Sequence, residues 1–276
     1  MRSAEGGACA ESPRGLKPAA RSYKPLLEST AVSMSTPDEL SNHSASGDPR
    51  RAVIELAELA GGLAHELRNP LSTIMINLKL LAEELQDLDS HSSDVRRRAV
   101  LKVDVLRREA ERLQSLFDEF LNLTGPYALQ RVDVDLNLVL ARLVEFCEPL
   151  LSAHHIRVTV DAACDPPHCP VDEKLLRQAL LNIVINAQQS MPAGGELRMG
   201  TGMDGDCAFL AVADTGVGIP RQYQDAVFRP FFSTKSGGTG LGLSITQRII
   251  HEHDGTLTFH SELGKGTTFI IRLPLH

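Results

Sequence analysis

The chain lacks several features that would assign it quickly to a class of protein. No uncharged apolar run approaches the ~20 residues that span a bilayer, and the opening MRSAEGGACAESPRG has no apolar core of a secretory signal. Five cysteines, scattered and odd in number, fit reduced thiols better than a disulfide framework. A net charge of -7 gives no general affinity for nucleic acid phosphates. We therefore expect a cytoplasmic protein with no membrane insertion and no nucleic acid partner.

Composition divides the chain into three expected regions. Residues 1–50 are rich in Ala, Ser, Gly and Pro and hold too few large apolar side chains to offset the entropy of ordering. We predict that this segment is disordered, with room for a short helix at 23–28. Residues 51–126 are expected to be helical, and residues 127–276 are expected to form a separate α/β domain.

Two apolar stripes with spacings of three and four residues predict two long helices. The polar stretch DSHSSD (89–94) separates them and offers Ser92, Ser93 or Asp94 as an N-cap, and the second helix is expected to end before Gly125-Pro126. The first stripe is Leu56, Leu59, Leu63, Leu67, Leu71, Ile74, Leu78, Leu81, Leu85 and Leu88; the second is Val95, Ala99, Val103, Leu106, Ala110, Leu113, Phe117, Phe120 and Leu123. A helical hairpin of this kind buries only part of its stripes, so we expect it to dimerise into a four-helix bundle.

The first helix contains an unusual segment, GGLAHELRNPLS (61–72). His65 lies two positions from Leu63 and from Leu67, so it points ~200° away from each, outside the seam. Asn69, four residues on, shares this outward face. Pro70 removes the backbone hydrogen bond to the carbonyl of Glu66 and loosens or bends the helix. An exposed histidine is either inert or reactive, and spacing alone does not decide between the two.

Strand and helix signals alternate in the second half. We predict helices at 136–153, 172–190 and 240–252, and strands at 156–161, 196–201, 207–213, 256–261 and 267–273. Helices alternating with a mainly antiparallel set of strands indicate a two-layer α/β sandwich. The predicted fold class of the whole chain is therefore α+β.

Three stretches of this half favour nucleotide chemistry, although each has a plainer interpretation. Asn182 and Asn186 share a helix face and offer amide oxygens to Mg²⁺, or they lie at a solvated edge. Asp214 in ADTGVGIP ends a strand before Gly216 and Gly218 and can accept from an exocyclic amine. The glycines of SGGTGLGLSI stand at a helix start, where they either expose N–H groups to phosphate or mark an ordinary turn.

Taken in order, these stretches resemble the bacterial two-component sensor histidine kinases over roughly residues 51–276, and within that family the soluble kinases of the nitrogen-regulation type. LAHELRNPLS resembles the phosphoacceptor box, LLNIVINAQQS the N box, DTGVGIP the first glycine box, FRPFFSTK the phenylalanine box and GTGLGLSI the second glycine box. The resemblance implies a histidine kinase/Hsp90-like ATPase domain behind the hairpin. It also implies that the proline stands beside the phosphorylated histidine.

The resemblance assigns roles to individual residues. His65 would attack the γ-phosphate of ATP, with Glu66 as the base that orients or deprotonates its ring. Asn186 would hold Mg²⁺ with Asn182 as a helper, and Asp214 would accept from the adenine amine. The stretch 219–239 would be a mobile lid in which Phe228, Phe231 and Phe232 dock the lid rather than touch ATP. The remaining nucleotide contacts would be Gly216, Gly218, Lys235, Gly238, Thr239, Gly240, Leu241 and Gly242.

The same resemblance implies partners. A response regulator would receive the phosphoryl group on an aspartate and dock around His65, and Glu66 with Asn69 matches the family's E-x-x-N pattern for dephosphorylating that regulator. The short N-terminal segment leaves no room for an ordinary sensor domain, so we expect the stimulus to arrive through a separate sensor protein. The family's H-G-G appears here as HDG (253–255), which we expect to be tolerated beside a turn.

Other classes remain as alternatives. The second half would also fit a DNA-repair or chaperone-type ATPase or a serine-directed anti-sigma kinase; the first two carry a glutamate where this chain has Asn182, and none has the His65 helix. A non-catalytic nucleotide-binding scaffold is the alternative from a different class. CDPPHC (164–169) offers only three metal-capable side chains, so we interpret it as a solvated loop rather than a zinc site.

Overall fold

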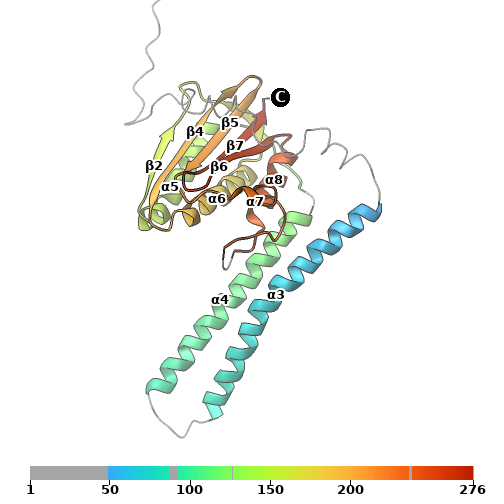
Figure 1. The fold of residues 1–276 in the computed structure, drawn as a ribbon, viewed down its shortest axis with the longest axis vertical. Helices are drawn as coiled ribbons and strands as arrows, with labels where there is room; N and C mark the ends of the chain where they lie inside the picture. Colours follow the sequence, from blue (N-terminus) through green and yellow to red (C-terminus); the bar gives the residue numbers. More distant parts are fainter. Residues whose placement is uncertain (1–48, 87–92, 126, 236–237, 276) are drawn as a thin grey trace, which may run out of the picture. The chain divides into compact units, whose positions relative to one another are not determined.

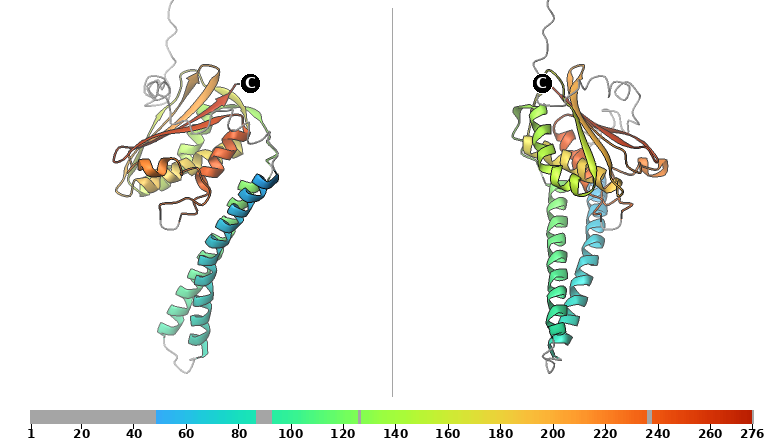
Figure 2. Two further views of the ribbon diagram at one scale, coloured as in Figure 1. Left: turned by 45° about the vertical axis from the view of Figure 1, so that its right-hand side comes forward. Right: turned by 90° about the vertical axis from the view of Figure 1, so that its left-hand side faces the viewer.

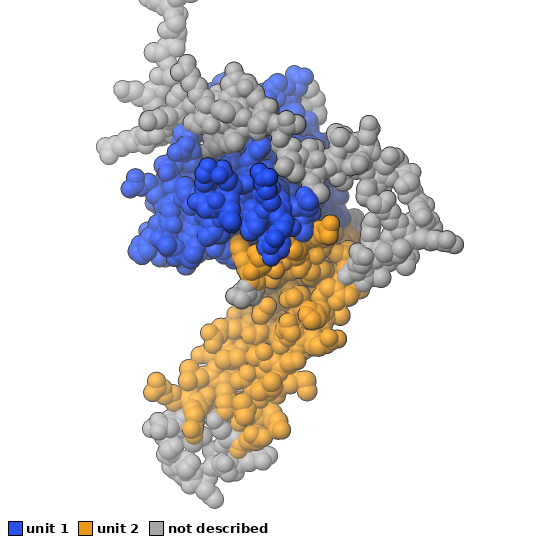
Figure 3. Space-filling model, viewed as in Figure 1, with its two compact units in different colours: residues 1–36, 127–228, 246–276 blue, residues 37–126, 229–245 orange. Residues whose placement is uncertain are grey.

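The computed structural model describes residues 49–86, 93–125, 127–235 and 238–275. These residues form two compact units, shown in different colours in Figure 3. The sheet unit contains Tyr127–Phe228 and the residues from Thr246 onward, and the hairpin unit contains the described residues up to 125 together with Arg229–Ile245. Disorder was predicted for residues 1–50, and this is wrong for Pro49 and Arg50, which begin helix α3. The rest of that segment, the short helix predicted at 23–28 and the loop at 89–92 lie outside the described residues.

Two long helices form most of the hairpin unit. Helix α3 (Pro49–Gln86) and helix α4 (Ser93–Thr124) lie side by side and run in opposite directions (Figures 1 and 2). Helix α3 continues without interruption through Pro70, and α4 ends immediately before Gly125. The predicted helical hairpin is thus confirmed.

The hairpin buries only part of its apolar surface. Leu116 on α4 and Pro70 on α3 are buried, although neither belongs to the predicted stripes. Leu71 and Phe117, which do belong to them, remain 47% and 53% exposed. The stripes are wider than the face that a single partner helix can cover, so one antiparallel pair leaves one edge of each stripe exposed.

The sheet unit is built on five strands in the order β2-β4-β5-β7-β6. They are β2 (Ile156–Asp161), β4 (Gly195–Asp204), β5 (Cys207–Asp214), β6 (Thr256–Glu262) and β7 (Gly266–Pro274). Strand β2 is parallel to β4, and the other neighbouring pairs are antiparallel. The central strand β5 is buried along nearly its whole length, which places the core of the unit at the middle of the sheet.

Helices cover one face of this sheet, as Figures 1 and 2 show. They are α5 (Leu136–Ala153), α6 (Glu173–Ser190) and α8 (Gly242–Glu252), of which the part from Thr246 belongs to the sheet unit. Asp135 caps α5 and Asp172 caps α6, each accepting from two backbone N–H groups of the first turn. The predicted two-layer α/β sandwich is confirmed, and its helices and strands agree with the predicted ranges within a few residues.

Three short elements were not predicted. Strand β1 (Val132–Asp135) pairs antiparallel with β3 (His168–Val171) in a separate two-stranded sheet, and α7 (Arg221–Gln224) is a single turn. The interpretation of CDPPHC as a solvated loop is therefore wrong for its last two residues. His168 begins β3 and Cys169 is fully buried, because the pairing with β1 turns alternate side chains inward.

Among the described residues, no helix is both long and apolar enough to cross a membrane.

Candidate active site

The first group of predicted site residues lies on α3 in the hairpin unit. His65 and Asn69 are exposed and Glu66 is half-buried, as the helical geometry predicts for a face turned away from the seam. Since proline lacks an N–H, the carbonyl of Glu66 loses its donor in the helix ladder. One turn further on, Ser72 Oγ donates to Arg68 O at 2.8 Å and Thr73 Oγ1 donates to Asn69 O at 3.2 Å. Such hydroxyl bonds compete with the helix ladder, and here they follow directly on the carbonyl that proline leaves without its donor.

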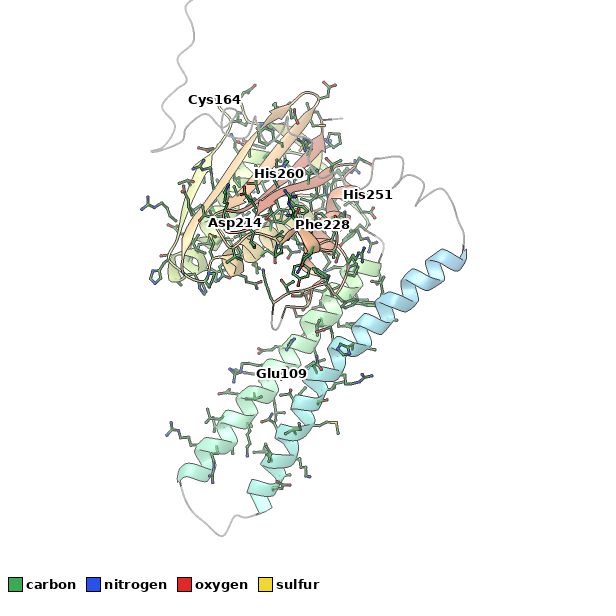
Figure 4. The ribbon with its side chains drawn as sticks, in the orientation of Figure 1. Glu109, Cys164, Asp214, Phe228, His251 and His260 are labelled. Carbon is green, nitrogen blue, oxygen red and sulfur yellow. The ribbon has the colours of Figure 1, made fainter. Side chains whose placement is uncertain are left out.

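The second group surrounds Asp214 at the end of β5 in the sheet unit (Figure 4). The carboxylate is buried, and its Oδ1 accepts from Gly216 N at 2.8 Å and from Thr267 N at 3.2 Å. Ser190 Oγ, at the end of α6, lies 3.1 Å from the same oxygen. These contacts fix the orientation of the carboxyl group, so that its other oxygen has a defined direction for a ligand amine.

The loop after Asp214 depends on its two glycines. A Cβ added to Gly216 would lie 2.7 Å from Ser190 O and 2.8 Å from Asp214 Oδ1, so any side chain there would displace both. Gly218 has φ +71°, a conformation that L-residues rarely adopt, and the loop bends there towards the β6–β7 turn. Gly264 N donates to Val217 O at 2.8 Å and holds the loop from the other side.

The two asparagines lie on one half-buried face of α6 in the same unit. Asn182 and Asn186 are four residues apart, and Asn182 Nδ2 donates to Thr246 Oγ1 of α8 at 3.4 Å. Thr246 is fully buried and lies 3.4 Å from Ala179 O, so this contact ties α8 to α6. The amide oxygens are hard donors of the kind that Mg²⁺ accepts.

The aromatic residues of the predicted lid have separate positions. Phe228 belongs to the sheet unit, where its ring packs edge-on against Phe259 of β6 with the centroids 5.7 Å apart (Figure 4). Phe231 and Phe232 belong to the hairpin unit, where both are half-buried. Phe228, within the predicted lid segment 219–239, therefore packs against the sheet.

The remaining predicted nucleotide contacts also fall in the hairpin unit. Lys235 is exposed, with its backbone N–H held by Ser233 Oγ at 3.1 Å, and Leu241 is fully buried. Gly238, Thr239 and Gly240 lie between Lys235 and α8, and Gly242 is the first residue of α8. Thr239 Oγ1 accepts from Leu241 N at 3.3 Å and donates to Glu119 Oε2 of α4 at 2.7 Å.

Several residues that shape these groups were missed. Ser190, Thr246 and Thr267 touch or hold predicted site residues from elsewhere in the chain, and Glu119 holds the lid. Ser190 ends the segment that resembles the N box, so its position carried a usable signal. Glu119 lies in a repetitive charged helix, and nothing in its sequence context distinguishes it.

The residues of the sheet unit fit an adenine nucleotide with magnesium. A buried, rigidly held carboxylate suits the exocyclic amine of a purine. The adjoining Gly216 packs so closely on Ser190 and Asp214 that no side chain fits there, which keeps the backbone close to the carboxylate. Asn182 and Asn186 supply neutral oxygens, which suit a cation that keeps phosphate oxygens and waters in its shell.

Comparisons with known proteins agree with this geometry. Residues 55–124 match the His Kinase A (phospho-acceptor) domain, and residues 171–276 match the histidine kinase-, DNA gyrase B- and HSP90-like ATPase family. Sensor histidine kinase ZraS of Escherichia coli (strain K12) is 33% identical over 227 residues, 82% of this chain and 47% of the relative. Sporulation kinase C of Bacillus subtilis (strain 168) is 33% identical over 221 residues, 79% of this chain and 49% of the relative.

Solved structures show the same arrangement of elements. Full-length ShkA, determined in complex with AMPPNP, matches with a TM-score of 0.58 and 26% identity over 79% of this chain and 45% of its own. Histidine kinase ThkA, determined in complex with response regulator protein TrrA, shares the fold with a TM-score of 0.67 and 23% identity over 86% of this chain and 67% of its own. The chain spans about half the length of the curated relatives ZraS and sporulation kinase C. With a phosphoacceptor domain followed by this ATPase domain, the chain belongs to the family of two-component sensor histidine kinases.

Proposed function

We propose that the chain is an ATP-dependent protein histidine kinase that phosphorylates itself on His65 and passes the phosphoryl group to an aspartate of a response regulator. One observation carries the proposal: His65 is exposed on α3 within the segment that matches a phospho-acceptor domain. A domain that matches an ATPase family follows in the same chain. A relay of this kind needs both parts, an accessible acceptor and a site for the donor.

His65 is the nucleophile of the proposed reaction. A ring nitrogen of His65 forms the N–P bond with the γ-phosphorus of ATP while the bond to the bridging oxygen breaks and ADP leaves. Glu66, the next residue on α3, is half-buried and accepts the ring proton or holds the ring through a rotamer that turns towards it.

The nucleotide roles follow the positions of the described residues. Asp214 accepts from the adenine amine, and Gly216 and Gly218 let the backbone of the following loop turn closely around the ring. Asn186 with Asn182 holds Mg²⁺, which neutralises phosphate charge when bound. The lid residues bind the phosphates through their backbone N–H groups, and Lys235 also binds them through its ammonium group. These residues are Lys235, Gly238, Thr239, Gly240, Leu241 and Gly242.

The hairpin has exposed surfaces for two binding partners. A response regulator docks on the face around His65, where Glu66 and Asn69 also supply the pattern for removing its phosphoryl group. A second copy of the chain covers the apolar surface that one hairpin leaves exposed. That surface contains Leu71, Met75, Ile76, Leu78, Val100, Leu101, Val103, Phe117 and Leu121. Because the reaction draws on the cytoplasmic ATP pool, we place these domains in the cytoplasm.

The test is autophosphorylation with labelled Mg-ATP, scored as acid-labile, base-stable phosphate. Wild-type protein is expected to take up label, and His65→Gln is expected to take up none. His251→Gln is the matched control, since His251 is also an exposed histidine on a helix (Figure 4). Label that persists in His65→Gln would exclude His65 as the acceptor. ATP binding without any label in the wild type would favour the non-catalytic scaffold.

A further inference from the structure

Phe231 has a backbone conformation that is unusual for a bulky residue. Its φ is +62°, in the left-handed region that aromatic side chains rarely occupy. Such a conformation persists only where surrounding contacts hold it, and it is concentrated at clamps and switches. The contacts around Phe231 therefore indicate what holds the lid in this position.

The ring of Phe231 is seated on Gly62 of α3. The segment Arg229–Ile245 and the hairpin helices belong to the same compact unit. A Cβ added to Gly62 would lie 2.7 Å from Phe231 Cε2, 2.8 Å from its Cγ and closer still to Cδ2. The ring thus occupies the space that any larger residue at this position would fill. At the neighbouring Gly61, an added Cβ would meet nothing within 4 Å beyond its own helix.

Two further contacts hold the same part of the lid. Gly240, with φ +70°, passes so close behind the Phe231–Phe232 peptide that an added Cβ would lie 2.7 Å from Phe232 N. Thr239 Oγ1 donates to Glu119 of α4 at 2.7 Å. The lid is therefore fastened to both helices of the hairpin, through an aromatic contact on α3 and a charge-assisted hydrogen bond on α4.

The position of Gly62 on α3 gives this contact its significance. Gly62, His65, Glu66 and Asn69 stand at i, i+3, i+4 and i+7, so they share one face of the helix. Phe231 consequently contacts the phosphoacceptor face one turn before His65. A side chain on Gly62 would shift the lid segment, including the second glycine box, relative to that face.

We propose that Gly62 is a positioning residue for autophosphorylation: its missing side chain is the seat for Phe231, which sets the register of the lid against the helix that carries His65. The proposal rests on the proposed function above. Gly62 touches neither ATP nor the reacting atoms, and it acts through Phe231. Displacement of reacting groups by about 1 Å lowers rates by up to about a hundredfold, so a small shift of the lid has a measurable effect.

The experiment compares Gly62→Ala with Gly61→Ala in the full chain. Both substitutions replace a glycine in α3 with alanine and bring a similar gain in helix propensity. A difference in kcat between the two variants therefore reports the contact between Gly62 and Phe231 alone. We expect Gly62→Ala to lower kcat for autophosphorylation about tenfold or more relative to Gly61→Ala, with the Kd for ATP within about twofold. Circular dichroism and Tm, which should not fall in either variant, exclude a merely structural effect.

Phe231→Ala and the double variant Gly62→Ala/Phe231→Ala complete the test. If Gly62 acts only through Phe231, the double variant autophosphorylates no more slowly than Phe231→Ala, because the missing side chain of Gly62 has no function once the Phe231 ring is removed. Equal rates for Gly62→Ala and Gly61→Ala, or additive losses in the double variant, would overturn the inference while leaving the kinase activity intact. Absence of label in the wild type would instead overturn the proposed function.

Discussion

Thr239 and Glu119 are joined by a 2.7 Å hydrogen bond, although they are 120 residues apart in the chain. The threonine hydroxyl also accepts from Leu241 N at 3.3 Å, so one side chain caps the turn before α8 and binds the lid to α4. Ser115 Oγ donates to the other carboxylate oxygen of Glu119 at 3.4 Å and helps to orient it. The lid position therefore depends on an acidic residue outside every recognised motif.

Thr239→Val and Glu119→Ala are each expected to lower the autophosphorylation rate severalfold, and together by less than the product of the two. The coupling should be about 1 kcal/mol, a factor of about five, because each variant alone already breaks the bond. A double-mutant cycle on kcat/KM measures it. Asp118→Ala, which removes the neighbouring exposed carboxylate, is the control and should match the wild type. Strictly additive losses would show that the bond does not contribute.

Asp214 can be tested with two substitutions that separate binding from folding. Asp214→Asn keeps an acceptor for the N–H groups of Gly216 and Thr267 but presents an amide where the adenine amine must be accepted. We expect ATP affinity to fall about tenfold to a hundredfold with little change in Tm. Calorimetric titration with ATP measures the first effect, and Asp206→Asn, at an exposed position, is the control.

Asp214→Leu should lower stability as well, by about 1–3 kcal/mol, because two buried N–H groups lose their acceptor. Urea unfolding of the full chain measures this difference. Equal stability of Asp214→Asn and Asp214→Leu would contradict the assignment of Asp214 Oδ1 as the acceptor of these bonds.

The ionisation of Asp172 is expected to make the free energy of unfolding depend on pH in the acid range. Burial alone would raise the pKa of its carboxyl group, but backbone hydrogen bonds outweigh burial and lower the pKa below its ordinary 3.8. The donors are the N–H groups of Gln130, Leu175 and Lys174. The ionised form is the stabilising one, so its contribution is complete above pH 3.8 and is lost as the pH falls through the lowered pKa of the folded state.

Substitutions at the α6 cap check this sign. Asp172→Ala should cost about 1 kcal/mol at neutral pH, the usual value of an N-cap. Asp172→Asn keeps the capping oxygen without the charge, so it should lose less and should lack the acid-dependent part. Urea unfolding of the three proteins as a function of pH is the measurement. An advantage of the wild type that grows on acidification would contradict the assignment.

In the HDG sequence, substitutions at the adjacent residues Asp254 and Gly255 are expected to have different effects on Tm. Asp254 has φ +57° in the turn after α8, a conformation that aspartate tolerates, and its Oδ2 accepts from Arg131 Nη2 at 2.7 Å. Asp254→Gly relieves the backbone and loses this exposed ion pair, so Tm should change little. At Gly255 an added Cβ would lie 2.5 Å from Arg272 O, so Gly255→Ala should lower Tm by several degrees. Thermal unfolding of the two variants measures Tm, and similar Tm values would contradict this prediction.

Local signals predicted most of the fold. Helices α5 and α6 have regular apolar spacing behind an aspartate cap, and their observed bounds are Leu136–Ala153 and Glu173–Ser190. Strands β1 and β3 have four residues each and pair across more than thirty positions, so no local pattern announces them. The extent of the buried surface on α3 was not predicted either, because Leu71 of the predicted stripe is 47% exposed whereas the proline beside it is buried.

The positions of the proposed site residues were predictable where they depend on a single helix or strand. The exposure of His65 and Asn69 follows from helical geometry alone, and Asp214 follows from its place at a strand end. Partners that come from elsewhere in the chain were not predictable. The N–H of Thr267 reaches Asp214 through the pairing of β5 with β7, and Phe231 reaches Gly62 through tertiary packing.

The burial of Cys169 in β3 has a practical consequence for chemical labelling. Burial, and secondarily the charge of Asp133, raises the pKa of this thiol to about 11. At neutral pH roughly one molecule in ten thousand then carries the reactive thiolate, and Cys147 is also buried with a raised pKa. Cys164, five residues before Cys169, is the exposed one of the four described cysteines (Figure 4). Among the described cysteines a maleimide dye should therefore attach first at Cys164, beyond the end of β2 and away from Asp214.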